Sequence, residues 1–170
     1  MNHAEQLQLI DQFEAHYRYD STYIRELLEY SPDAFAKYLA FRPFNSHRES
    51  LSLEVFWIGK IAALQVADCG HCLQLIVRIA LEAGVAKELI RATLQGGSKL
   101  SESLKDVYDY ATCVAAYKLP DPILEARIRQ QLSKAQLIEL GICVSTVTVF
   151  PTIKRALGYT KSCSLIEIEV

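Results

Sequence analysis

The sequence predicts an all-α protein, a single domain spanning residues 1–170 with its core helices at about residues 50–95. Apolar residues recur at helical spacing along most of the chain, and capping or breaking residues separate the periodic runs. Alternating, strand-like patterns are nearly absent. Hydrophobic residues make up 51% of the chain and charged residues 22%, a balance typical of a globular protein with a sizeable core.

The N-terminal third contains three predicted helices. Amphipathic patterns cover residues 4–18 and 22–30. Ser31 is suited to the N-cap of a third helix, because Pro32 then occupies the first helical position, where proline is tolerated. The stretch FRPFNSHRES, residues 41–50, reads as a loop after that helix.

Residues 50–66 are apolar on nearly every side, which predicts a central helix surrounded by others. Glu54, Lys60 and Gln65 interrupt the apolar run, which falls short of the roughly 18 uninterrupted apolar residues that favour a membrane span. We therefore expect a core helix and no association with a membrane.

The following helices are marked by caps and breakers. Asp68 can cap a helix over 69–83 that ends at Gly84, and another helix runs from about 86 to the glycines at 96–97. The stretch LSESLKDVYDYATCVAAYKL, residues 100–119, has helical spacing and is stopped by LPDP.

The C-terminal segment begins with SKAQ, residues 133–136, a capping box that opens a long helix over 134–158. Pro151 should kink that helix, because proline removes a backbone hydrogen bond. The final residues SLIEIEV, 164–170, alternate like a strand.

Charge and composition exclude some classes of function. The net charge is −2 and the basic residues are scattered, so the sequence has no footprint of a nucleic-acid-binding protein. The N-terminus lacks the pattern of a signal peptide, and we expect a cytoplasmic protein. Helices such as 50–66 and 134–158 keep apolar residues on many faces, which indicates a homo-oligomer.

Two cysteines stand three residues apart in the stretch ADCGHCLQLIVRIALEAGV, residues 67–85. The helix dipole and the free N–H groups of the first turn favour a thiolate here, and most strongly at Cys69. Cys72 lies one turn further on, so the two thiols could form a disulfide without a large backbone movement. The alternative is that both are small residues packed in a core.

The other cysteines and the histidines do not add to the CxxC pair a pattern typical of a metal site. Cys113 and Cys143 lie in mid-helix among apolar residues and read as packed side chains, whereas Cys163, beside Lys161, could be a third exposed thiol. Zinc sites need a second CxxC or a histidine pair at fixed spacing, and the histidines are scattered. They are His3, His16, His47 and His71. We expect no metal site and no cofactor.

The tetrapeptide CGHC is also the active-site motif of protein disulfide isomerases. Those proteins have a thioredoxin fold, in which a β-strand leads into the motif. In this chain the preceding stretch LEVFWIGKIAALQVAD has a helical pattern, so the tetrapeptide looks convergent.

Residues 50–95 resemble the alkylhydroperoxidase D-like (AhpD-like) family, also called the carboxymuconolactone decarboxylase superfamily. The likeness rests on an apolar helix followed by a CxxC that opens a helix ending in EAGV. The tail FPTIKRALGYTKSC, residues 150–163, is similar to that of an uncharacterised branch with CGxC. The resemblance implies an oligomeric AhpD-like helical bundle and a thiol-dependent peroxidase or disulfide reductase. Its substrate would be a small peroxide or disulfide, reduced at the expense of a thiol reductant or redox partner protein.

The resemblance also implies roles for the cysteines. Cys72 stands at the family's peroxide-attacking position and Cys69 at the resolving one, although the dipole alone favours Cys69 as the more acidic thiol. The family surrounds the pair with a glutamate and a histidine that relay a proton. Trp57 and Ile76 occupy those positions here, so the usual relay is absent.

Two residues could replace the relay. His71, between the cysteines, is either a catalytic base or a solvated first-turn residue. Glu54 either handles a proton or forms a structural ion pair with Arg78 on the opposing helix. The loss of the relay also favours an alternative function, a non-enzymatic or ligand-binding helical protein with a degenerate redox site.

Overall fold

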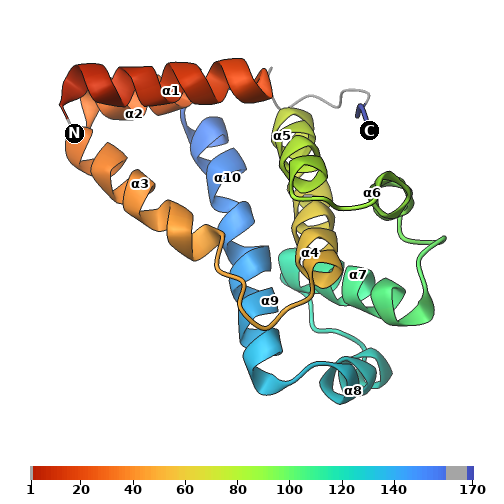
Figure 1. The fold of residues 1–170 in the computed structure, drawn as a ribbon. Coiled ribbons are helices and arrows are strands. Elements are labelled where there is room, and N and C mark those ends of the chain that lie inside the picture. The colour runs from red at the N-terminus through yellow and green to blue at the C-terminus, as the bar shows by residue number, and fades with distance from the viewer. Residues whose placement is uncertain (1, 160–167) are drawn as a thin grey trace.

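The predicted all-α architecture is confirmed by the computed structural model, which describes residues 2–159 and 168–170 and has no strand among them. Figure 1 shows α1 crossing one end of the molecule, with α9 and α10 forming a nearly continuous rod. The helices are α1 (His3–Tyr17), α2 (Thr22–Tyr30), α3 (Pro32–Asn45), α4 (Leu53–Val66), α5 (Gly70–Glu82), α6 (Lys87–Leu94), α7 (Glu102–Ala115), α8 (Pro122–Gln131), α9 (Lys134–Val147) and α10 (Val149–Ala156).

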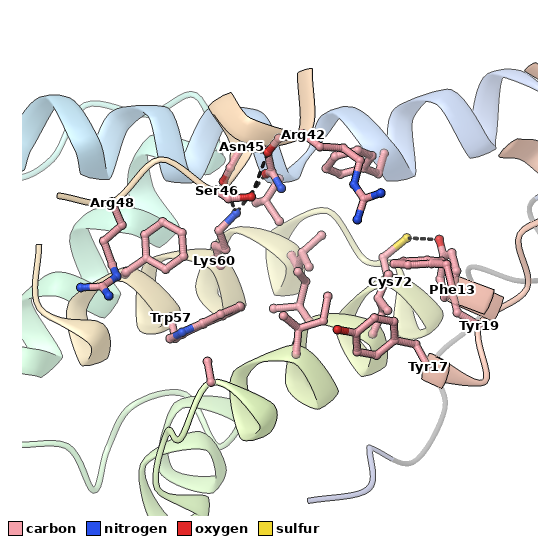
Figure 2. A pocket seen from close by; sticks show the side chains of 18 of the residues that line it. Phe13, Tyr17, Tyr19, Arg42, Asn45, Ser46, Arg48, Trp57, Lys60 and Cys72 are labelled. Carbon is pink, nitrogen blue, oxygen red and sulfur yellow. Dashed lines mark hydrogen bonds between the residues drawn. The ribbon is translucent and has the colours of Figure 1, made fainter. Parts of the chain in front are cut away.

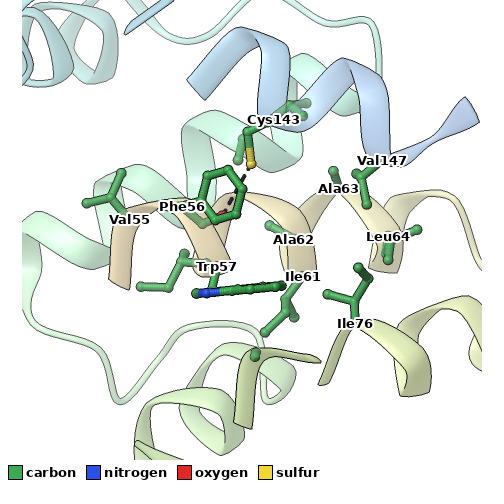
Figure 3. Close-up of a cluster of buried hydrophobic side chains, with 14 of the residues drawn as sticks. Val55, Phe56, Trp57, Ile61, Ala62, Ala63, Leu64, Ile76, Cys143 and Val147 are labelled. Carbon is green, nitrogen blue, oxygen red and sulfur yellow. Dashed lines mark hydrogen bonds between the residues drawn. The ribbon is translucent and has the colours of Figure 1, made fainter. Parts of the chain in front are cut away.

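Helix α4 is the centre of the larger hydrophobic core. Residues 55–64 are all buried, and the helix contacts α5, α6, α7 and α9. Gly59 permits the close approach of α9, because a Cβ at this position would lie 2.8 Å from Cδ1 of Leu140. The close-up in Figure 3 shows side chains of α4 meeting those of α5 and α9. The predicted central helix is confirmed.

A second, smaller hydrophobic cluster is formed by the first three helices. Its buried members are Ile10, Tyr19, Tyr23, Ile24, Leu28 and Phe35. Tyr19 and Tyr23 pack edge to face, with ring centroids 6.5 Å apart. This cluster touches α5 and α10 through Leu75 and Ile153, so it covers one side of the larger core.

The predicted loop over residues 41–50 is wrong in its first half, because α3 continues to Asn45 with Pro43 inside its last turn. Aromatic contacts favour this continuation: Phe41 packs against Phe44 and Phe150, at centroid distances of 6.1 and 6.0 Å. A proline costs less near a helix end, where few backbone hydrogen bonds remain to be lost.

Helix α8 is absent from the sequence interpretation, in which LPDP served only as a breaker. The side chain of Asp121 accepts hydrogen bonds from the N–H groups of Ile123 and Leu124, and Pro122 occupies the first helical position. The Asp-Pro pair is therefore a start signal as well as a stop signal.

The C-terminal segment matches the predicted start and interruption. Ser133 and Gln136 form the expected capping box, and the segment breaks at Thr148 between α9 and α10. Pro151 lies three residues beyond this break, where it cannot supply the N–H of a continuous helix. The predicted strand over 164–170 lies mostly outside the described residues, and 168–170 are not a strand.

By length and hydropathy, Lys134–Ala156, the segment of α9 and α10, could cross a membrane, and 39% of its most apolar window is buried in the protein. The contact between α9 and α4 gives its buried residues partners within the core. Packing in the core therefore explains part of the hydrophobicity of this segment.

The loop before α4 is held by a buried carboxylate. Glu139 on α9 accepts hydrogen bonds from the backbone N–H groups of Glu49, Ser50 and Leu51, at 2.9–3.1 Å. Burial raises the pKa of this carboxyl, but the backbone N–H groups outweigh it and leave the pKa below its usual value. The ionised carboxylate thus fixes the entry to α4.

Substitution Glu139→Gln tests this role. Removing the charge should lower the free energy of unfolding at pH 7 by about 1–3 kcal/mol, because charge-assisted hydrogen bonds are lost. Since the folded-state pKa lies below the unfolded one, the stabilisation is present at neutral pH and disappears as the pH falls through the folded value. Urea unfolding from pH 7 to pH 3 should show the difference from wild type shrinking. Glu29→Gln, at an exposed position, is the control, and an equal loss of stability there would contradict the assignment.

Candidate functional site

The CxxC pair lies at the start of α5, as predicted, but the N-cap of the helix is one residue later than predicted. Cys69, not Asp68, is the N-cap, and Asp68 adopts a left-handed conformation with φ 49°. The Sγ atoms of Cys69 and Cys72 are 2.9 Å apart. A disulfide bond measures about 2.05 Å, so the two sulfur atoms need to approach by less than an ångström to form one.

A cavity of about 360 Å³ lies between the two hydrophobic clusters and reaches one sulfur of the pair. Its walls come from α1 to α5, the segments that follow α1 and α3, and the junction of α9 and α10. Cys72 is among the lining residues, whereas Cys69 is not. Figure 2 shows Cys72 and Tyr19 toward one end of the cavity and Arg48 and Trp57 toward the other. Although Cys72 is only 3% exposed to bulk solvent, a bound molecule could reach it through the cavity.

Tyr19 is the polar side chain that contacts Cys72 inside the cavity. Its hydroxyl lies 3.6 Å from the Cys72 Sγ. Burial raises the pKa of Tyr19 well above its usual value, so the hydroxyl keeps its proton near neutral pH. The ammonium of Lys154, itself buried, lies 4.8 Å from the centre of the Tyr19 ring and holds it by a cation–π contact.

Two further tyrosines continue from Tyr19 along the cavity wall. Tyr23 interacts with the hydroxyls of both Tyr19 and Tyr38. Burial raises the pKa of Tyr23 and Tyr38 as well, so all three hydroxyls remain available as donors. Sequence reasoning missed these residues, because nothing in the local pattern shows that Tyr19 folds against a cysteine 53 positions away.

The positions of the family's missing relay also line the cavity. Trp57 on α4 and Ile76 on α5 both face it, and Figure 3 shows them on neighbouring helices. The indole Nε1 of Trp57 is buried and has no hydrogen-bond partner among the described residues. The two positions that the resemblance assigns to the relay therefore face the cavity, but the side chains there cannot transfer a proton.

His71 and Glu54, unlike Tyr19, do not line the cavity beside Cys72. His71 is half-buried in the first turn of α5 and is absent from the cavity lining. Glu54 is exposed in the first turn of α4, at the end remote from the cysteines. Twelve helical residues separate Glu54 from the end of α4, a rise of about 18 Å.

The expected ion pair between Glu54 and Arg78 is not formed. Arg78 instead donates to the backbone carbonyls of Tyr17 and Arg18, and its guanidinium lies 3.4 Å from Glu169. Arg78 therefore attaches the end of α1 and the C-terminal residues to α5. Because Glu54 is exposed to water, its charge needs no buried partner.

The other cysteines are peripheral to the cavity. Cys143 is buried in α9 and donates to the carbonyl of Phe56, and burial raises its pKa to about 12, as befits the predicted packed thiol. Cys113 is half-buried, and Cys163 lies outside the described residues. Among 2–159 and 168–170, no three His, Cys, Asp or Glu side chains are placed to hold a metal ion.

The charged groups of the cavity wall are all basic. Arg42, Arg48 and Lys60 line the cavity, and none of the described lining residues is acidic. Lys60 is only 2% exposed, and its Nζ donates to the carbonyl and to Oδ1 of Asn45 at 2.7 and 2.9 Å. Burial lowers the pKa of Lys60 to about 8, because no carboxylate pairs with it among the described residues.

Substitution Lys60→Met should therefore stabilise the protein. The pKa falls from 10.5 to about 8 on folding, which corresponds to a cost of about 3 kcal/mol while the group is charged. This cost is present in full below pH 8 and is relieved as the pH rises toward 10.5. Thermal unfolding should show a higher Tm for Lys60→Met at pH 7 and a smaller difference at pH 10. A lower Tm than wild type at pH 7 would show that the bonds to Asn45 outweigh the cost of burial.

Comparison with known proteins relates the central part of the chain to one family. Residues 32–98 match the model of the carboxymuconolactone decarboxylase family. This segment runs from α3 through α6 and includes both cysteines and Lys60, whereas the similar tail at 150–163 lies outside it. No curated protein and no solved structure gives a significant match to the chain. Over residues 32–98, the chain is thus similar to the carboxymuconolactone decarboxylase family, in agreement with the AhpD-like resemblance that the sequence indicated.

Proposed function

We propose that this protein is a thiol-dependent peroxidase or disulfide reductase in which Cys72 attacks the substrate and Cys69 resolves the product. The observation that carries the proposal is the position of the two sulfur atoms. Cys72 lines the cavity, and the Sγ of Cys69 lies 2.9 Å from it, outside the lining. A substrate in the cavity thus meets Cys72 first, and Cys69 is within reach of the product. The cavity supports the order of roles that the family resemblance implies, rather than the order that the helix dipole favours.

The peroxidase reaction balances with these two thiols. The Cys72 thiolate attacks the terminal oxygen of a hydroperoxide, the O–O bond breaks, and an alkoxide leaves and takes up a proton to become an alcohol. The Cys72 sulfenic acid then reacts with the Cys69 thiol, which forms the disulfide and releases water. An external dithiol reduces the disulfide and is itself oxidised. With a disulfide substrate, the same Cys72 thiolate displaces one sulfur as a thiol.

Tyr19 can take the part of proton donor that the family's relay plays elsewhere. Its hydroxyl is protonated near neutral pH and lies 3.6 Å from the attacking sulfur, where a departing alkoxide would form. Tyr23 and Tyr38 provide a path along which the proton could be replaced. His71 and Glu54, the candidates from the sequence, do not line the cavity.

A binding protein without catalysis is the second candidate. The apolar side chains of Trp57 and Ile76 at the relay positions favour it, as does the near-complete burial of both thiols. In such a protein the cavity would hold a ligand, and the cysteines would pack beneath it. The reactivity of the cysteines separates the two functions.

Peroxide treatment of cysteine variants tests the redox proposal. With stoichiometric peroxide, wild type should lose both thiols to a disulfide between Cys69 and Cys72, whereas Cys69→Ser should stop at a sulfenic acid on Cys72. Mass spectrometry with a sulfenic-acid trap reads out both products. A trapped sulfenic acid on Cys69 in Cys72→Ser, with Cys69→Ser inert, would reverse the roles. If neither cysteine outpaces Cys113 or Cys143, the binding function replaces the redox one.

Substitution Tyr19→Phe tests the proton donor. Reduction of tert-butyl hydroperoxide should slow at least about tenfold, because its basic alkoxide needs a proton as it leaves. Reduction of peracetic acid should change little, since acetate leaves without one. Stopped-flow measurement of thiol loss gives both rates, and Tyr110→Phe on α7, away from the cavity, is the control. Equal slowing with both oxidants would mean that Tyr19 only shapes the cavity.

We also propose that the protein is a cytoplasmic homo-oligomer. Several large apolar side chains near the turn between α7 and α8 are exposed, namely Tyr117, Leu119 and Ile123. A second copy could cover them. Light scattering after size exclusion should give at least the mass of a dimer at micromolar concentration, and a strictly monomeric protein would contradict the proposal.

A further inference from the structure

We infer that the cavity binds the anion of a carboxylic acid with an apolar chain, its carboxylate beside Lys60, Trp57 and Arg48 and its chain extending toward Cys72. The inference concerns what the cavity selects, and it stands on the charges and the shape of the wall. It goes beyond the redox proposal, because binding does not require either cysteine to react.

The charged side chains that line the cavity are all positive, which favours an anionic ligand. Lys60, Arg42 and Arg48 line it, and the described wall contributes no aspartate or glutamate. Lys60 has three N–H donors, of which two go to Asn45, so one remains for a ligand. A buried ammonium without a carboxylate partner costs free energy, and a bound anion would offset that cost.

A second unsatisfied donor lies on the same face of α4. Trp57 precedes Lys60 by three residues, and side chains at this spacing are neighbours on a helix. Trp57 lines the cavity, and its indole Nε1 is buried and has no partner among the described residues. Figure 2 shows Arg48 and Trp57 both toward the end of the cavity opposite Cys72. The indole N–H is thus a second buried donor without a partner on the helix that carries Lys60.

The buried charge favours a singly charged head group. Lys60 is the buried cation of the wall, whereas Arg42 and Arg48 are exposed and screened by water. The single negative charge of one carboxylate neutralises the single positive charge of the buried Lys60 ammonium. A doubly charged phosphate would leave its second charge without an equally buried partner.

The rest of the wall accepts an apolar chain. Hydrophobic side chains form much of the rest of the wall, among them Phe13, Leu64, Leu75, Ile76, Ile79 and Phe150. Such a wall favours a hydrocarbon chain through burial of apolar surface. A last step rests on the proposed function. If that function holds, the substrate that Cys72 reduces is a hydroperoxide of such an acid, with its peroxide group at Cys72.

The single tryptophan of the chain reports on binding. Trp57 is the only tryptophan in the sequence and lines the cavity, so its fluorescence should respond to a ligand there. Reduced protein at pH 7 is titrated with decanoate, decanol and decylamine, and calorimetry is run in parallel. We expect saturable binding of decanoate at least ten times tighter than that of the alcohol or the amine. Equal affinity for the three compounds, or no binding of decanoate by either method, would overturn the inference.

Variants locate the carboxylate. Lys60→Met should weaken the binding of decanoate at least tenfold, or about 1.4 kcal/mol, and leave the affinity for decanol unchanged. Arg48→Gln, at an exposed position, should weaken the binding of decanoate two- to threefold. Lys87→Met, on α6 outside the cavity, is the control. Unchanged decanoate affinity in both cavity variants would overturn the placement of the head group. Because the titrations do not depend on thiol oxidation, a failure of the redox proposal leaves them unaffected, and a failure of binding leaves the peroxide experiment unaffected.

Discussion

The burial of α4 on all sides is the constraint on which the rest of the structure depends. Residues 55–64 are all buried, so other segments must surround this one helix, and α5, α6, α7 and α9 all contact it. Even a charged residue, Lys60, is enclosed in this way. Glu139 fixes the segment that enters α4, and the three residues at 67–69 connect α4 to α5. The position of the CxxC pair at the start of α5 follows from that short connection.

The candidate site exists because the smaller N-terminal cluster closes against this core. Tyr17, Tyr19 and Phe13 supply one wall of the cavity, and α4 and α5 supply the other. Arg78 connects the two parts through the carbonyls at the end of α1. The site is thus built across an interface between two hydrophobic clusters, a common location for ligand cavities.

The positions that the resemblance assigns to a proton relay hold apolar side chains in this chain. Trp57 and Ile76 make the relay positions apolar, while Tyr19, from a distant part of the chain, brings a protonated hydroxyl to Cys72. A tyrosine differs from a glutamate–histidine pair in that burial keeps it protonated, so it favours donating a proton over accepting one. Lys60 is the buried charged group of α4 that lines the cavity.

Sequence alone determined the fold class, most helix boundaries and the CxxC pair, because caps, prolines and apolar periodicity act over only a few residues. The capping box at Ser133 and the start of α3 at Pro32 are examples. Tertiary structure decided what lies around the cysteines. Tyr19 is 53 residues from Cys72, and no local pattern encodes their contact. For the same reason an ion pair with Arg78 was one of two roles predicted for Glu54, whereas the fold leaves Glu54 in water and turns Arg78 toward the carbonyls of Tyr17 and Arg18. Local propensity is set by neighbours in the chain, but a site is set by the packing of segments that only folding brings together.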